Sequence, residues 1–520
     1  MLEGFRNEPL LDLRLAEVRA ASKTALEDLD RRLPIEVPAL IGDQRLRGDR
    51  LVSTDPGGPG RVIAEAPLAG RELANQAVDQ ALSGFERWSA EATADRARVL
   101  IRAAELIRRR RLELVSLEVR EAAKPWAEAD ADVAEAIDYL EYYSRRATAL
   151  AEGPQLVQVP GERNVLRYSA RGVTVAITPW NFPLAIPCGI VSAALATGNA
   201  VILKPAEQTP ATALTLVEAL REAGVPTAAI QLLPGEAEAG QALVEHPAVA
   251  TIGFTGSEAV GLDIIQRAAK TDDGQFQVKR VVCEMGGKNA IVVDADADLD
   301  QAVPAIVHSA FGYAGQKCSA ASRVLCSERI APQLEERLRG AVEVVTIGQA
   351  EEFATDVPPL IERSAQERVL RFIAQAGSEG RTVTRRDAPE RGWFVGPAVV
   401  AELPPHSSVI TEEVFGPLLT FETVASVEEA LDDLHSRRHA LTCGIFSRSP
   451  AVVDHFCTSA PAGNVYVNRH ITGAVVGRQP FGGNRHSGVG DKAGGPDYLL
   501  QFVNSHAISE NTMRHGLVAE

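Results

Sequence analysis

The chain has 520 residues, which is enough for about three domains of ordinary size. Hydrophobic residues make up 45% of it and charged residues 23%, a composition typical of a globular protein with sizeable cores. The net charge of −16 excludes a nucleic-acid scaffold, so we expect no nucleic acid as a partner.

The cysteines and the N-terminal segment indicate the compartment. Six cysteines are scattered along the chain without a CxxC pair, which argues against a zinc site and a disulfide framework, so no metal is expected. The first residues, MLEGFRNEPLLDLRLAEVRA, lack the apolar run of a secretory signal and are too acidic for a transit peptide. A cytoplasmic location fits these features.

The predicted elements begin with helices. Residues 71–88, 94–123 and 126–146 place apolar side chains three and four positions apart, which predicts three helices. The next stretch, 172–203, carries no charged residue and is long enough to cross a bilayer. Three prolines interrupt it, however, so it is predicted to be strand, loop, helix and strand, and no membrane partner is expected.

Short β-branched runs then alternate with helical segments. Strands are predicted over 173–177, 200–204, 230–234 and 251–256, and helices over 212–225 and 257–269. A second run starts near Glu284, with strands predicted over 289–294, 322–326, 441–447 and 463–468 and a helix over 299–311. The Gly-rich residues 480–500 are predicted to be irregular surface chain. This alternation predicts an α/β protein with parallel sheets.

Two segments are candidate nucleotide cradles, although no GxGxxG motif is present. Gly256 and Ser257 stand where a strand meets a helix, and free N–H groups there attract anions; a plain helix cap is the alternative. In LKPAE, the carboxylate of Glu207 could accept hydrogen bonds from a ribose and would repel a 2′-phosphate. A solvated ion pair with Lys204 is the alternative there.

Three polar residues are candidates for catalysis. Cys318, in GYAGQKCSAASR, is either a buried core thiol or a nucleophile. Asn181, in TPWNFP, either satisfies a turn or donates to an oxyanion. Glu284, in CEMGGKNA, is either a mobile general base or a partner of Lys288. Together they specify a thiol nucleophile, an oxyanion donor and a base beside a nucleotide cradle.

Seven ordered segments carry a family resemblance: TPWNFP, LKPAEQTP, GFTGS, EMGGKNA, GQKCSA, EEVFGP and PFGG. In these segments, and over residues 35–510, the chain resembles the NAD(P)-dependent aldehyde dehydrogenase superfamily. FRNEP, ADVAEAIDYLEYYSR, GQKCSAASR, ITGA and KAGGPDYL also resemble the monofunctional members that oxidise L-glutamate γ-semialdehyde to glutamate in proline catabolism. The resemblance implies NAD as cofactor, a homo-oligomer based on a dimer and transient contact with a separate proline dehydrogenase.

The resemblance also implies the domains. An NAD-binding, Rossmann-like domain would comprise 1–152 and 172–284, and a catalytic α/β domain 285–485. A small β element for bridging and oligomerisation would comprise 153–171 and 486–520.

Site roles are implied in the same way. Cys318 resembles the nucleophile, Glu284 the base that activates water, and Asn181 with the Cys318 N–H the oxyanion hole. The residues that match cofactor-binding positions are Thr178, Pro179, Trp180, Lys204, Glu207, Gly256, Ser257, Gly286, Glu413 and Phe415. The residues that match substrate-binding positions are Glu135, Phe182, Lys317, Ser319, Gly473, Ala474 and Phe481.

Two departures and three alternatives accompany the resemblance. Ala123 stands where the family often has glycine, and residues 484–486 (Asn-Arg-His) replace a more apolar or differently charged stretch. The alternatives are an aldehyde dehydrogenase for another semialdehyde, such as a CoA-acylating enzyme, a non-catalytic protein with the same fold, and a cysteine hydrolase. Glu284 argues for water as the final acceptor, and no Cys–His motif supports the hydrolase.

Overall fold

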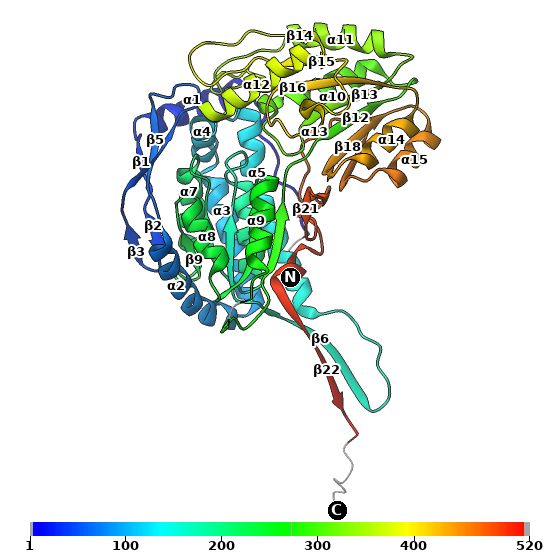
Figure 1. Cartoon of the computed structure of the whole chain (residues 1–520). Helices are drawn as coiled ribbons and strands as arrows, with labels where there is room; N and C mark the ends of the chain where they lie inside the picture. The colour runs from blue at the N-terminus through cyan, green and yellow to red at the C-terminus, as the bar shows by residue number, and fades with distance from the viewer. Residues whose placement is uncertain (1–3, 272, 514–520) are drawn as a thin grey trace, which may run out of the picture.

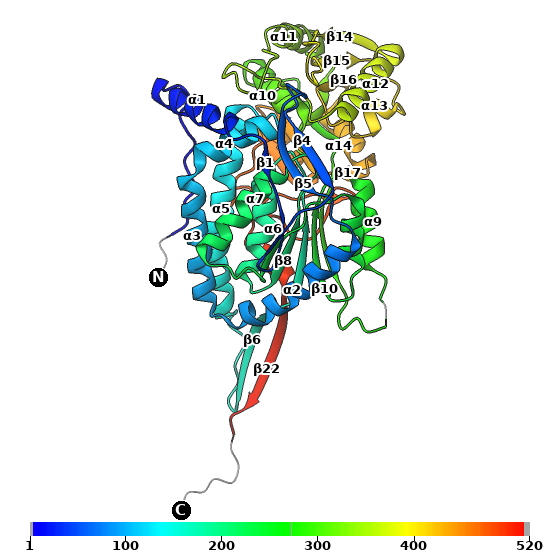
Figure 2. The same cartoon turned by 90° about the vertical axis from the view of Figure 1, so that its left-hand side faces the viewer.

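The computed structural model describes residues 4–271 and 273–513. The described chain forms two layered α/β units, and a two-stranded ribbon projects away from the first of them (Figure 1). Figure 2, turned by 90°, shows the same ribbon standing clear of both units.

The first unit is built on an eight-stranded sheet in the order β21-β11-β10-β7-β8-β9-β2-β3. The strands from β11 to β9 are parallel, and the strands at the two edges are antiparallel. The strands of this sheet are β2 (Ala39–Ile41), β3 (Gln44–Leu46), β7 (Val173–Ile177), β8 (Ala200–Lys204), β9 (Ile230–Leu232), β10 (Val249–Thr255), β11 (Arg280–Glu284) and β21 (Gly488–Val489).

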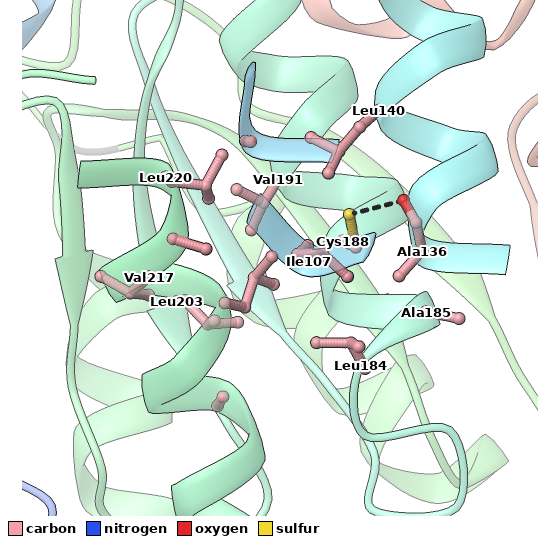
Figure 3. Close-up of a cluster of buried hydrophobic side chains, with 14 of the residues drawn as sticks. Ile107, Ala136, Leu140, Leu184, Ala185, Cys188, Val191, Leu203, Val217 and Leu220 are labelled. Atoms are coloured by element: carbon pink, nitrogen blue, oxygen red, sulfur yellow. Dashed lines mark hydrogen bonds between the residues drawn. The ribbon is translucent and has the colours of Figure 1, made fainter. Parts of the chain in front are cut away.

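Both faces of this sheet are covered by helices, because successive side chains of a strand point to opposite faces. In β8, Ile202 packs in the cluster with α2, α8 and α9, whereas Val201 and Leu203 pack in the cluster with α3, α5, α6 and α7. Figure 3 shows part of the second cluster, where the Cys188 thiol donates to the Ala136 carbonyl over 3.3 Å. Those helices are α2 (Arg71–Ala90), α3 (Thr93–Arg109), α5 (Trp126–Glu152), α6 (Ala185–Ala196), α7 (Pro210–Ala223), α8 (Ala237–Glu245) and α9 (Glu258–Ala268).

The predicted helix over residues 94–123 is wrong as a single element. The chain breaks at Arg110, whose φ of −95° and ψ of 12° end α3 and begin α4 (Arg111–Glu121). The break re-aims the second half toward α1 (Ala16–Asp30), which the sequence analysis did not anticipate. The predicted strands over 173–177 and 200–204 and the helix over 299–311 are confirmed.

The second unit is built on a seven-stranded sheet in the order β14-β15-β16-β13-β12-β18-β19, parallel except at β14. Its strands are β12 (Asn289–Val293), β13 (Ala321–Ser327), β14 (Arg381–Arg385), β15 (Ala398–Ala401), β16 (Leu418–Val424), β18 (Thr442–Phe446) and β19 (Asn464–Val467). Its helices are α10 (Leu299–Phe311), α11 (Ala331–Glu343), α12 (Arg363–Glu379), α13 (Ser408–Thr411), α14 (Val427–Ser436) and α15 (Pro450–Ser459).

Three small sheets complete the described fold. Two of them are β4 (Arg50–Thr54) with β1 (Ile35–Glu36) and β5 (Val62–Pro67), and β17 (His439–Ala440) with β20 (Asn484–Arg485). The third is the projecting ribbon of β6 (Glu162–Ala170) and β22 (Val503–Asn511), which pair antiparallel along their whole length. The Gly-rich segment therefore contains β20, β21 and the start of a 3-10 turn, η2 (Tyr498–Phe502), between irregular stretches.

The uncharged stretch 172–203 is divided between β7, α6 and β8, as predicted. Within the described residues, no helix is long and apolar enough to cross a membrane.

Candidate active site

A tight turn delivers Cys318 to the junction between the two units. After α10 the chain forms η1 (Gly312–Gly315), in which Tyr313 and Ala314 have positive φ angles of 54° and 53°. These left-handed residues reverse the chain before β13 begins. Gln316, fully buried, then accepts the N–H of Ile361 over 2.9 Å and anchors the turn.

A buried amide holds the loop that carries the thiol. Asn289 Nδ2 donates to the carbonyl oxygens of Cys318 and Ala320 over 2.7 and 2.9 Å. Its Oδ1 accepts the N–H of Thr442 over 3.0 Å. Asn289 thus ties the loop to β12 and β18, which the sequence analysis missed because an amide in EMGGKNA gives no local sign of its distant partners.

The thiol of Cys318 opens into a cavity of about 100 Å³. Besides Cys318, seven predicted site residues line it: Glu135, Phe182, Glu284, Ser319, Gly473, Ala474 and Phe481. The remaining lining residues are mostly apolar or aromatic: Tyr139, Ile186, Gly189, Ile190, Thr255, Met285, Ala493 and Tyr498. Segments far apart in the sequence therefore meet around one sulfur atom.

Glu284, the last residue of β11, lies against a pair of glycines. Its Oε2 accepts the N–H of Gly483 over 3.1 Å, and a Cβ atom on Gly482 would stand 2.7 Å from its Oε1. A side chain at position 482 would therefore displace the Glu284 carboxylate from this position. Burial raises the pKa of Glu284 to about 8, against the Gly483 hydrogen bond and the nearby charge of Lys492, which lower it.

The Cys318 thiol is protonated at neutral pH. Burial raises its pKa to about 12, and the negative charge of Glu284 raises it further than that of Glu413 does. The attacking form of a cysteine is nevertheless the thiolate. In this environment the proton has to leave as the sulfur attacks, so a base is needed beside it.

Asn181 is buried just beyond the end of β7, and its Nδ2 donates to the Gln316 carbonyl over 3.0 Å. That bond aims the amide at the turn before Cys318. Lys317 has a different environment from the one expected. It does not line the cavity, because its Nζ pairs with Glu128 over 2.6 Å and is buried there.

Glu135 brings a carboxyl group into the cavity from α5. Burial, reinforced by the charge of Asp132, raises its pKa to about 8, while Lys124 and a hydrogen bond with Tyr139 lower it. A cation entering the cavity would favour the ionised form and bind there.

A second cavity, of about 400 Å³, lies at the carboxyl ends of the parallel strands, where open α/β sheets bind ligands. Seven predicted cofactor residues line it: Thr178, Pro179, Trp180, Lys204, Glu207, Gly256 and Ser257. Thr255 lines both cavities, so the two adjoin.

The second cavity contains features suited to a nucleotide. Ser257 caps α9, accepting the Val260 N–H over 3.4 Å, and the start of this helix favours an anion. Lys204 Nζ and Glu207 Oε1 are 2.7 Å apart. The ion pair foreseen as an alternative is therefore present, and the Glu207 side chain, 35% exposed, still reaches the cavity.

The other three predicted cofactor residues form a group outside these linings. Glu413 Oε1 accepts the Gly287 N–H over 3.0 Å, and a Cβ atom on Gly286 would meet Glu413 Oε2 at 2.1 Å. Phe415 packs edge-on against Trp180, with ring centroids 5.8 Å apart. Trp180 thus connects this group to the second cavity.

Comparison with known proteins decides the family. The profile described as "Aldehyde dehydrogenase family" matches residues 46–508. The chain belongs to the aldehyde dehydrogenase family.

Individual members of this family are similar over the whole chain. A "1-pyrroline-5-carboxylate dehydrogenase" of Geobacillus thermodenitrificans is 42% identical over 98% of this chain and 100% of its own length. The solved "1-Pyrroline-5-Carboxylate Dehydrogenase from Thermus with bound NAD" has a TM-score of 0.96 and 39% identity, and the match covers 98% of this chain and 99% of that one. Proline utilization A (PutA) of Bdellovibrio bacteriovorus has a TM-score of 0.97 and 40% identity, and the match covers 99% of this chain but 54% of that one.

The other thiols of this aldehyde dehydrogenase lie elsewhere. Cys188, Cys283, Cys326 and Cys443 are buried core residues, and Cys457 is exposed on α15. Among the described residues, no group of three or more His, Cys, Asp and Glu side chains could hold a metal ion.

Proposed function

We propose that this aldehyde dehydrogenase oxidises L-glutamate γ-semialdehyde, the open form of 1-pyrroline-5-carboxylate, to L-glutamate with NAD, the second step of proline catabolism. The observation that carries the proposal is the cavity that joins the Cys318 thiol to Glu135 and two phenylalanine rings. An amino-acid head needs groups of both signs, and a short methylene chain needs apolar walls. The family relatives with that substrate in their names support the same proposal.

The α-ammonium and the α-carboxylate of the substrate would bind to different residues of the cavity. Glu135 would bind the α-ammonium, and the Ser319 hydroxyl with the main chain of Gly473 and Ala474 would bind the α-carboxylate. The rings of Phe182 and Phe481 would flank the methylene chain. Lys317, paired with Glu128, would contribute positive charge behind Ser319 without direct contact.

NAD fits the second cavity. Lys204 and Glu207 would hold the adenosine ribose, and the start of α9 at Gly256 and Ser257 would hold the pyrophosphate. Thr178, Pro179 and Trp180 line the way to the thiol, and Gly286, Glu413 and Phe415 would hold the nicotinamide ribose. A Glu207 carboxylate favours NAD over NADP, because it repels a 2′-phosphate.

The chain's own residues supply nucleophile, base and oxyanion donors. Sγ of Cys318 attacks the aldehyde carbon while its proton passes to Glu284, and Asn181 Nδ2 with the Cys318 N–H holds the oxyanion. Bound NAD would supply the hydride acceptor for this carbon, and loss of the hydride would leave a thioester on Sγ of Cys318. Glu284 releases its proton to solvent and then takes a proton from water, whose oxygen attacks the thioester. The C–S bond breaks, Glu284 returns this proton to the Cys318 thiolate, and glutamate leaves.

The proposed function is tested by initial rates with three aldehydes and two cofactors. We expect glutamate semialdehyde to exceed succinate semialdehyde and acetaldehyde in kcat/KM, and NAD to exceed NADP. A preference for acetaldehyde would refute the substrate assignment, and dependence on coenzyme A would refute water as the acceptor.

Glu135→Gln should weaken the binding of substrates that carry an α-ammonium group and leave the binding of other aldehydes unchanged. A lost hydrogen bond to a charged group is worth roughly 1.5–3 kcal/mol, so we expect KM for glutamate semialdehyde to rise about 10- to 100-fold. KM for butanal, which has no ammonium, should stay unchanged. Glu141→Gln, also on α5 but paired with Arg145, is the matched control. Equal effects on both aldehydes would contradict the assignment.

The domain division is part of the proposal. Residues 1–152 and 172–284 contribute the sheet beside the second cavity, and 285–485 contribute the sheet that carries Cys318. Residues 153–171 and 486–520 contribute the β6–β22 ribbon, while β21, from the same range, extends the first sheet. Residues 1–3, 272 and 514–520 of these ranges lie outside the described residues.

The ribbon is proposed to join two copies into a homo-oligomer. It projects from the body (Figure 1), and within the described residues its two strands pair only with each other. The Ile508 side chain on β22 is 44% exposed. We expect Ile508→Asp to lower the mass in light scattering to that of one chain, 55.6 kDa. Val344→Asp, at an exposed valine of the second unit, should leave the mass unchanged. An Ile508→Asp oligomer as stable as the wild type would contradict this role.

We also propose transient contact with a separate proline dehydrogenase. The support is that a PutA chain about twice as long contains a region matching 99% of this one. Co-sedimentation of the two purified enzymes tests the contact.

A further inference from the structure

One lysine is sealed inside the protein next to the proposed oxyanion donor. Lys124, between α4 and α5, has 0% of its surface exposed. The preceding Ala123 has a φ of 51°, a left-handed turn that sends the lysine inward. This is the position where the family often has glycine, which adopts such a conformation without strain. A buried ammonium group is tolerated only where protein groups satisfy its charge.

The groups that contact the Lys124 ammonium lie on the segments around the Cys318 cavity. Lys124 Nζ donates to the main-chain carbonyl of Asn181 over 2.8 Å. It also stands 3.9 Å from the ring centroid of Phe182 and 5.0 Å from that of Tyr313. Contacts between a cation and a ring face are strongest when water is excluded, as here. The Lys124 ammonium group thus contacts both Asn181, whose amide is the proposed oxyanion donor, and the ring of Phe182, which lines the cavity.

Lys124 also forms an ion pair with Asp132, and this pair holds the far end of the loop that begins at Asn181. Asp132 Oδ2 lies 3.2 Å from Lys124 Nζ, and Asp132 Oδ1 accepts the N–H of Ala185 over 2.7 Å at the start of α6. Burial and Asp132 raise the pKa of neighbouring Glu118 well above its usual range, which favours the neutral form of Glu118 beside the Lys124–Asp132 pair. Residues 181–185 are therefore fixed at both ends by one buried pair.

We propose that Lys124 is a positioning residue of the oxidation: its ammonium group orients the Asn181 amide toward the oxyanion and fixes the Phe182 ring against the substrate. This rests on the proposed function for the role of Phe182, and on the thiol chemistry alone for Asn181. Asn181 affects the transition state, whereas Phe182 affects substrate binding. Removal of the Lys124 charge therefore lowers kcat through Asn181 and raises KM through Phe182.

The test replaces Lys124 with methionine, which keeps the chain length and removes the charge. Because a misplacement of about 1 Å costs on the order of 100-fold in rate, we expect kcat to fall about 10- to 100-fold. KM should rise several-fold for glutamate semialdehyde and also for butanal, which has a methylene chain but no ammonium to contact Glu135, while KM for acetaldehyde, which has no methylene chain to clamp, should not rise. A merely structural loss would lower kcat through fewer active molecules and leave the KM values alone. Lys23→Met, at an exposed lysine, is the matched control.

Double-variant cycles identify the route of the effect. In an Asn181→Ala background, Lys124→Met should reduce kcat by less than about threefold. In a Phe182→Leu background it should no longer raise KM. Full, additive losses in both backgrounds, or wild-type kcat and KM in Lys124→Met, would overturn the inference. If Lys124→Met does not fold, Asp132→Asn, which keeps the acceptor for Ala185, takes its place in both cycles.

A second substrate separates this inference from the proposed function. Acylation of Cys318 by p-nitrophenyl acetate needs the thiol and the oxyanion donor but neither cofactor nor an amino-acid head. A wild type that is acylated but leaves glutamate semialdehyde unoxidised would refute the proposed function alone. Lys124→Met acylated at the wild-type rate would refute the positioning of Asn181.

Discussion

We expect Cys318→Ser to abolish the reduction of NAD, with kcat lowered by a factor on the order of 10⁴ or more, as for other enzymes that lose their nucleophile. A serine hydroxyl is a far weaker nucleophile than sulfur, and none of the described residues that line the cavity is a histidine that could activate it. Stopped-flow absorbance of NADH measures both the first turnover and the steady rate. Both should vanish together, because the thioester cannot form.

The loss should occur in a folded protein. Cys318 is partly exposed toward the cavity, so its replacement by an oxygen of similar size leaves the core packing intact. We expect the melting temperature and NAD binding to match the wild type. Cys457→Ser, at the exposed thiol of α15, is the matched control and should keep full activity. NADH formation by Cys318→Ser at a rate near that of the wild type would exclude covalent catalysis by this residue.

The parallel strands and their ends were predictable from the sequence. Runs such as 173–177 and 200–204 are fully or nearly buried on both faces, so they are predominantly apolar and end at polar motifs. Since the carboxyl ends of parallel strands share one edge, the motifs at residues 178–183, 204–207 and 256–257 had to meet there. That geometric rule explains why the cofactor residues could be proposed together.

Side-chain pairing across the fold was not predictable. Lys317 was expected beside the substrate, yet it pairs with Glu128, which stands 189 positions earlier. Asn289 and Lys124 looked unremarkable because each donates to a main-chain carbonyl far away in the sequence, and such a carbonyl carries no sequence signal. Every residue type has the same main-chain carbonyl, and these carbonyls lie far from their donors in the sequence. A local sequence pattern therefore cannot reveal such hydrogen bonds.

Glu284→Gln removes the proposed base, and we expect kcat at pH 7 to fall about 10²- to 10⁴-fold, the usual contribution of general base catalysis. The amide keeps the size of the side chain, and its oxygen still accepts the N–H of Gly483. The loss therefore reports the proton transfer rather than the packing of the loop.

The pH dependence gives the sharper test. Glu284 acts as a base only when ionised, and its pKa is raised to about 8, so the wild-type rate should rise tenfold per pH unit below 8 and level off above it. Without this carboxylate, hydroxide must take the proton of Cys318, whose pKa is raised to about 12. The rate of Glu284→Gln should then climb tenfold per unit from pH 7 to 10 with no plateau.

The pH–rate profiles of the wild type and of Glu284→Gln should differ in shape. The wild type has a carboxyl group that titrates near pH 8, whereas the amide of the variant does not titrate. Glu328→Gln, at an exposed carboxylate, is the matched control and should keep the plateau above pH 8. A plateau near 8 that survives in Glu284→Gln would assign the titrating base to another group in the cavity. Glu135 would then be the first residue to examine, since burial raises its pKa to about 8 as well.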